Sequence, residues 1–82
     1  DFKFNIYPNP SSGNFNIIYL LPSNKEGKLE IFDITGKIVY EMRLPQWSTL
    51  QNISLPNLSG GIYAVKITSD GSSVVKKVIL RE

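Results

Sequence analysis

Hydrophobic and polar residues alternate along most of this chain, so the dominant period is two residues rather than the 3.6 of a helix. The alternation is clear at Phe15, Ile17 and Tyr19. Each alternating run is short, rich in β-branched and aromatic residues, and bounded by Gly, Pro, Asn, Asp or Ser. The pattern predicts no helix longer than one turn and about seven strands, roughly at residues 3–7, 14–20, 28–33, 37–43, 50–55, 61–69 and 73–81.

Short strands about ten residues apart are typical of an Ig-like antiparallel β-sandwich, which is the all-β fold that we predict. The longer loops at Pro22–Gly27 and Pro45–Thr49 are expected to cross from one sheet to the other. No repeat or linker divides the chain, so residues 1–82 are expected to form a single domain. The alternation assigns the following residues to its core: Phe4, Ile6, Phe15, Ile17, Leu29, Ile31, Ile53, Leu58, Tyr63, Val65 and Ile67.

Two dipeptides predict tight hairpins. Asp70-Gly71 lies between two alternating runs, and Asp-Gly tolerates the positive φ angles that a type I′ turn requires at both central positions. Thr35-Gly36 is expected to do the same between residues 28–33 and 37–43, with Gly36 as the left-handed residue.

Tyr7-Pro8-Asn9-Pro10, followed by Gly13, is a stiff segment because each proline fixes its own φ and favours extended backbone in the residue before it. We expect these residues to be held extended. Two compatible roles are open: a strand terminator at a sheet edge, or a docking edge for a partner protein.

Leu58-x-x-Gly61-x-Tyr63 has a structural interpretation. Leu58 would anchor the loop, Gly60-Gly61 would permit a sharp entry into the strand, and the Tyr63 hydroxyl would bond back to nearby backbone, a corner device known in sandwich folds.

The last segment, Val74 to Leu80, has apolar residues on both faces and the pair Lys76-Lys77 in its middle. It is predicted to be a bulged strand, an edge strand whose lysines oppose pairing with another chain, or a cationic surface that binds a partner. Trp47 lies in a loop, where it would cover the core or stack on a sugar or base.

The chemistry of the chain excludes several classes of function. Cys and His are absent, which removes disulfides, thiolate metal sites and the commonest general base, and we expect neither an enzyme nor a cofactor. The net charge is only +2, and apart from Lys76-Lys77 the basic residues are scattered, so no nucleic acid is expected. The longest apolar run, Ile17–Leu21, is far too short to insert in a membrane.

Four segments in this order closely resemble the C-terminal sorting domain of the type IX secretion system, the T9SS type A sorting family of Bacteroidota. They are Pro8-Asn9-Pro10 with Gly13, Ile31 to Val39 around Gly36, Leu58 to Ile67 with Gly61 and Tyr63, and Lys76-Lys77-Val78-Ile79-Leu80. The resemblance covers about Phe4 to Arg81. Gly60, where many members have Ala or Pro, and the Arg81-Glu82 ending depart from the family pattern.

The resemblance implies a domain that directs a periplasmic passenger across the outer membrane to the cell surface or the medium. Its partners would be the translocon and a sortase-like surface protease that removes it. The chain, which begins at Asp1 rather than Met, would be excised from a larger exported protein. We expect a monomer that does not insert in the membrane.

The residues expected to be recognised by that machinery are Pro8, Asn9, Pro10, Gly13, Gly61, Tyr63, Lys76, Lys77, Val78 and Leu80, while Gly36, Asp70 and Gly71 are expected to form structural turns. The alternative function is an Ig-like accessory module of a secreted enzyme, either glycan-binding or a spacer. A glycan-binding module should expose two or three coplanar aromatic side chains.

Overall fold

Seven strands form two antiparallel sheets within residues 2–22 and 24–81, the part of the chain that the computed structural model describes. They are β1 (Lys3–Tyr7), β2 (Asn14–Leu20), β3 (Gly27–Phe32), β4 (Ile38–Leu44), β5 (Leu50–Ser54), β6 (Gly61–Ser69) and β7 (Ser72–Leu80). No helix occurs in the described residues. The predicted strands are confirmed, and those whose ends differ do so by one residue.

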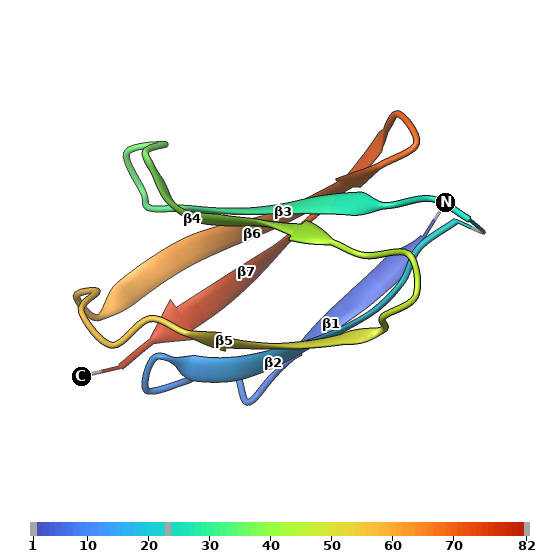
Figure 1. The fold of residues 1–82 in the computed structure, drawn as a ribbon. Helices are drawn as coiled ribbons and strands as arrows, with labels where there is room; N and C mark the ends of the chain where they lie inside the picture. Colours follow the sequence, from blue (N-terminus) through green and yellow to red (C-terminus); the bar gives the residue numbers. More distant parts are fainter. Residues whose placement is uncertain (1, 23, 82) are drawn as a thin grey trace.

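The sheets have the strand orders β1-β2-β5 and β4-β3-β6-β7, and they face each other as the two layers of a sandwich (Figure 1). The chain passes from one sheet to the other after β2 and after β4, as the two long loops predicted, and again after β5. β1 and β7 are edge strands of different sheets, and they contact each other.

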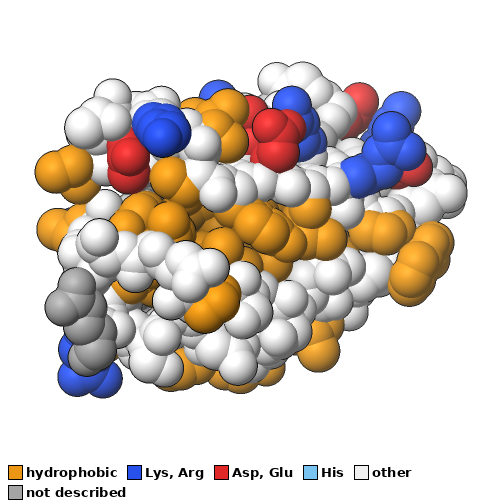
Figure 2. All heavy atoms as spheres, turned by 60° about the vertical axis from the view of Figure 1, so that its left-hand side comes forward, with side chains coloured by type: hydrophobic (Ala, Val, Ile, Leu, Met, Phe, Trp, Pro, Cys, Tyr) orange, Lys and Arg blue, Asp and Glu red, His pale blue; other side chains and the backbone are white. Residues whose placement is uncertain are grey.

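The core lies between the layers because alternate side chains of each strand point inward. Nine of the eleven residues expected in the core are buried, while Ile6 and Leu58 are partly buried against it. The sequence prediction missed six further buried residues: Phe2, Tyr19, Leu44, Leu55, Val78 and Leu80. Figure 2 shows hydrophobic side chains in a band between the layers, with most of the charged side chains on this face above the band.

The β6–β7 hairpin has the predicted type I′ character. Asp70 has φ 52° and Gly71 has φ 80°, and these two residues alone separate Ser69 from Ser72. No atom comes within 4 Å of a Cβ built on Gly71, so only backbone conformation disfavours a side chain there.

The β3–β4 connection is not the two-residue hairpin that we expected. Gly36 has the predicted positive φ of 89°, but Thr35 does not share it, and the connection runs from Asp33 to Lys37. The Asp33 carboxylate organises this loop by accepting hydrogen bonds from the hydroxyl and N–H of Thr35 and the N–H of Lys37. The Thr35 hydroxyl, helped by both N–H groups, holds the pKa of Asp33 below its ordinary value of 3.8, although partial burial opposes it.

Gly71→Val and Gly36→Val are each expected to lower the free energy of unfolding by about 1–3 kcal/mol, because a β-branched residue is strained at positive φ. Chemical denaturation measures the change. Gly71→Asn is the matched control, because Asn tolerates the left-handed region. A Gly71→Val protein as stable as Gly71→Asn would contradict the turn assignment.

Candidate functional site at the junction of the first turn and the last strand

Asn9 joins the β1–β2 connection to the edge of β7. Its side-chain Nδ2 donates to the carbonyl oxygen of Lys77 (2.9 Å), and its Oδ1 accepts from the N–H of Ile79 (3.0 Å). The planar amide uses one N–H as a donor and its oxygen as an acceptor, and it thus takes the place of the backbone of a neighbouring strand. Residues 8–10 form a bend, so the expectation of an extended segment is wrong. The peptide bonds before Pro8 and Pro10 are both cis.

Ser11 extends the same junction with its backbone. Its N–H donates to the carbonyl of Ile79 (2.8 Å), and its carbonyl accepts from the N–H of Arg81 (2.7 Å), which forms a parallel bridge opposite Leu80. Ser11 is 2% exposed, and its hydroxyl donates to the carbonyl of Asn14 and accepts from the N–H of Gly13. We call the contacts of Asn9 and Ser11 with Lys77–Arg81 the clasp.

Gly13 supports the clasp, because it connects Ser11 to the residues that follow β5. Its carbonyl accepts a hydrogen bond from the N–H of Leu55 at 2.6 Å, and a Cβ on Gly13 would lie 3.0 Å from the Leu55 carbonyl oxygen. The φ angle of Gly13 is 102°, which glycine adopts readily and other residues adopt only with strain. The side of Gly13 is therefore closed to a partner by the chain itself.

Tyr63 forms the predicted corner. It is 7% exposed, and its hydroxyl donates to the carbonyl of Ser59 at 2.7 Å. Tyr63 pairs with Val78, and Gly61, at the start of β6, pairs with Leu80. The third and fourth sequence signatures therefore meet in one strand pair.

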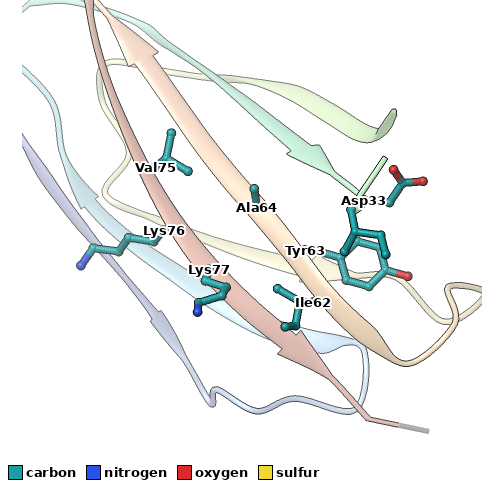
Figure 3. A pocket seen from close by; sticks show the side chains of 8 residues that line it. Asp33, Ile62, Tyr63, Ala64, Val75, Lys76 and Lys77 are labelled. Atoms are coloured by element: carbon teal, nitrogen blue, oxygen red, sulfur yellow. The ribbon is translucent and has the colours of Figure 1, made fainter. Parts of the chain in front are cut away.

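The side chains of β7 divide between the core and the solvent. The β6–β7 register is continuous, so the strand has no bulge and its lysines lie on an edge. Val78 and Leu80 are 0% and 4% exposed, so the folded domain does not present these two side chains to a partner. Lys76 and Lys77 are exposed, and Lys76 points away from Val75 and Ala64 in Figure 3.

The structure gathers most of the sequence-predicted recognition residues at one end of the sandwich. Those that remain accessible are Pro8, Asn9, Pro10, Gly61, Lys76 and Lys77. Asn9 and the two lysines also line a shallow hollow with Asn5 and Ile6. The turn residues Asp70 and Gly71 lie at the other end of β7. Ser11 and Ile79 were not predicted as part of the site, because they take part in the clasp through backbone groups, which no residue type signals.

Charge is distributed unevenly. The ion pairs of the described residues use Glu26, Glu30, Glu41 and Asp70, which face Arg43, Lys28 or Lys25 at 3.6–3.8 Å. Such exposed pairs add little stability. Within the described residues, Lys66, Lys76 and Lys77 form no ion pair. Their charges are therefore not neutralised by a paired carboxylate, and the β7 side of the domain is positively charged.

The described residues contain no group of three side chains suited to holding a metal ion. They also contain no helix with the length and hydropathy needed to cross a membrane. Trp47 is 82% exposed, so it does not cover the core. Tyr7 is the other markedly exposed aromatic side chain, and it pairs with Asn16 at the start of β2. The loop that carries Trp47 lies at the other end of β2, because the Tyr19 N–H donates to the carbonyl of Thr49. The two aromatic side chains therefore lie near opposite ends of the β1–β2–β5 sheet.

Asn9→Ala is expected to lower the free energy of unfolding by about 1–2 kcal/mol, because it removes two hydrogen bonds that together order the β7 edge. Denaturant unfolding measures this change, and hydrogen exchange at the Ile79 amide should accelerate. Asn57→Ala is the control, since Asn57 is also exposed and also follows a proline, but its side chain makes no hydrogen bond within the described residues. Equal effects of the two substitutions would show that the clasp does not stabilise the fold.

The strand order, the two-layer core and the tyrosine corner define an Ig-like β-sandwich. A solved structure of a DUF3244 family protein from Bacteroides vulgatus ATCC 8482, with an immunoglobulin-like β-sandwich fold, is similar with a TM-score of 0.74. The match covers 99% of this chain and 97% of that chain at 18% sequence identity, which shows the fold alone. A search of the curated proteins finds no match.

The chain belongs to the family of secretion system C-terminal sorting domains, whose family model matches residues 5–81. This family provides the C-terminal sorting signal of type IX secretion. Membership implies interaction with that system and export across the outer membrane, toward the cell surface or the medium.

Proposed function

We propose that this domain is the C-terminal part of a larger protein and carries a passenger from the periplasm through the type IX translocon. It acts as a monomer. A sortase-like protease at the cell surface then removes it, and the passenger is released or anchored. The observation that carries this proposal is the family match over residues 5–81.

The geometry supports a recognition role for one end of the sandwich. Two sequence signatures from opposite ends of the chain, Pro8-Asn9-Pro10 and Lys76-Lys77, lie together there, and a third signature, Gly61 to Tyr63, pairs with β7. Only the folded domain brings these residues together. The translocon would thus contact Asn9, Lys76 and Lys77 directly, while the buried Tyr63, Val78 and Leu80 would hold that surface in place.

The domain itself performs no catalysis in this proposal. Its family and its Ig-like fold are non-catalytic types, and neither His nor Cys occurs in the sequence. The glycan-binding alternative receives little support, because Trp47 and Tyr7 do not form a coplanar aromatic platform.

A reporter with a signal peptide, fused to the N-terminus of this domain and produced in a host with type IX machinery, tests the recognition surface. The parent fusion is expected to reach the cell surface or the medium. Lys76→Ser with Lys77→Ser should leave the free energy of unfolding within about 0.5 kcal/mol, because both side chains are exposed. The same variant should retain the reporter in the periplasm.

If this double variant were exported as well as the parent, Lys76 and Lys77 would not be part of the recognition surface. Lys28→Ser with Lys37→Ser is the control, since it removes two exposed cations from the β3–β4 side of the domain. Export of the control should be unchanged. A parent domain that folds but exports nothing would favour the spacer role.

A further inference from the structure

The outer edge of β7 is closed along only part of its length. The C-terminal part is occupied by the clasp, where the outward groups are the carbonyl of Lys77, both backbone groups of Ile79 and the N–H of Arg81. In an antiparallel pair, the backbone groups of alternate residues point away from the neighbouring strand. Since the register with β6 is continuous, Ser73, Val75 and the N–H of Lys77 point outward as well.

The outward backbone groups of Ser73 and Val75 have no hydrogen-bond partner among the described residues. An unpaired row of this kind is a template for another strand. Ser11 shows that the edge accepts backbone pairing, because it already forms a bridge opposite Leu80. The open part of the edge, Ser73–Lys77, can therefore take a short extended segment that ends beside Asn9.

Charge decides which kind of segment fits. Lys76 and Lys77 lie on opposite faces of β7 within the open edge, and neither has an ion pair among the described residues. A second copy of β7 pairing along this edge would bring like charges together, which opposes association. An acidic strand would instead place carboxylates beside both ammonium groups.

A hollow beside the open edge supplies apolar contacts. It has a volume of about 580 Å³ and is lined by Ile62, Ala64, Val75 and Lys77, with Asp33 and Ile34 on the β3 side (Figure 3). Ile62 and Val75 both line this hollow from the outward face of the sheet, and they are 48% and 58% exposed. In strand addition, backbone hydrogen bonds provide affinity, and contacts of alternate side chains provide specificity.

We infer that the open edge of β7, Ser73–Lys77, binds an extended acidic peptide by antiparallel strand addition. Residues directly opposite each other lie on the same face of a sheet, so the bound peptide places acidic residues opposite Lys77 and Lys76 and apolar residues opposite Val75 and Val74. This site goes beyond the sorting function and does not rest on it.

The probe is the peptide acetyl-Glu-Glu-Val-Val-Thr-amide, whose order follows from antiparallel pairing with Lys77 to Ser73. Titration into the ¹⁵N-labelled domain is expected to shift the amide signals of Val75 and Lys77 and to slow their hydrogen exchange. Acetyl-Lys-Lys-Val-Val-Thr-amide is expected to bind at least about tenfold more weakly than the acidic peptide. Added salt should weaken the binding of the acidic peptide, because it screens the attraction between opposite charges.

Val75→Pro removes an outward N–H while leaving the bonds to β6, and proline is tolerated at such edge positions. It should abolish binding, whereas Val75→Thr, which keeps the N–H, should bind like the parent. If Val75→Pro fails to fold, the acidic peptide with an N-methyl group on its first valine provides the same test. This peptide cannot donate to the Val75 carbonyl and should not bind.

Three results would overturn the inference. The first is equal binding of the acidic and basic peptides, which would remove the charge argument. The second is binding of the acidic peptide without slower exchange at Val75 and Lys77, which would indicate surface attraction only. The third is a concentration-dependent dimer, detected by sedimentation, that protects the same amides and so covers the edge with a second copy. Since the assay uses the domain alone, failure of export in cells would leave its outcome unaffected.

Discussion

Ile17→Ala is expected to lower the free energy of unfolding by about 2–5 kcal/mol, the range for truncating a fully buried aliphatic side chain. Ile17 is 0% exposed and lies on the inward face of β2, the central strand of its sheet. A domain of this size has a total stability of only about 5 kcal/mol or somewhat more. The variant should therefore keep at most about 3 kcal/mol of that stability, and at the upper end of the expected loss a large fraction of the molecules should be unfolded.

The neighbouring residue provides a matched control. Ile18 has the same side chain on the outward face of the same strand and is 45% exposed, so Ile18→Ala is expected to cost less than about 1 kcal/mol. Thermal and denaturant unfolding of both variants measures the difference. If the two substitutions had equal effects, the assignment of the β2 faces would be wrong.

Deletion of Lys76 to Glu82 is expected to unfold the domain. It removes the buried side chains of Val78 and Leu80, whose burial contributes about 3–6 kcal/mol together, as well as the half of β7 that pairs with Gly61–Val65. It also leaves Asn9 and Ser11 without their partners. The amide spectrum should collapse to the narrow dispersion of an unfolded chain.

Val78→Ser with Leu80→Ser keeps the chain length and should unfold the domain in the same way. By contrast, Lys76→Ser with Lys77→Ser should keep the dispersed spectrum. A truncated chain with a folded spectrum would show that β7 is dispensable for the sandwich, and it would contradict the role assigned to the clasp.

The period-two pattern predicted the strands well because one face of each strand is buried, and register then fixes every side chain. It failed where that condition is not met. β7 is an edge strand with Lys76 on the same side as Val74 and Val78, and its outward face carries the apolar Val75 and Ile79, so neither face has a uniform composition. Hence Val78 and Leu80 were not assigned to the core.

The other missed core residues lie near the ends of the alternating runs. Phe2 precedes β1, Leu44 is the last residue of β4 and Leu55 follows β5, and all three are buried where the chain enters or leaves a sheet. Tyr19 is different, because it continues the alternation of Phe15 and Ile17 and the period itself therefore places it in the core. Tertiary packing at the ends of strands is not encoded in the local period.

The candidate site was predictable only in part. The signatures identified Asn9 and the lysines of β7, but the hydrogen bonds from Asn9 to Lys77 and Ile79 span 68 and 70 residues, and no local pattern predicts such a contact. The Asp33 loop was mistaken for a shorter hairpin, because it has no second left-handed residue and is closed by the Asp33 carboxylate together with backbone hydrogen bonds from Asp33 to Lys37 and from Gly36 to Asp33. The sequence left two roles open for Trp47, covering the core or stacking on a sugar or base, and no local feature decided between them, whereas its 82% exposure excludes the first.

The most direct test of the sorting account compares one reporter fusion in two hosts that differ only in the type IX translocon. The measured quantity is the fraction of the reporter accessible to added protease on intact cells or present in the medium. The account predicts a high fraction with the translocon and retention in the periplasm without it. A folded domain that leaves the reporter in the same compartment in both hosts would contradict it.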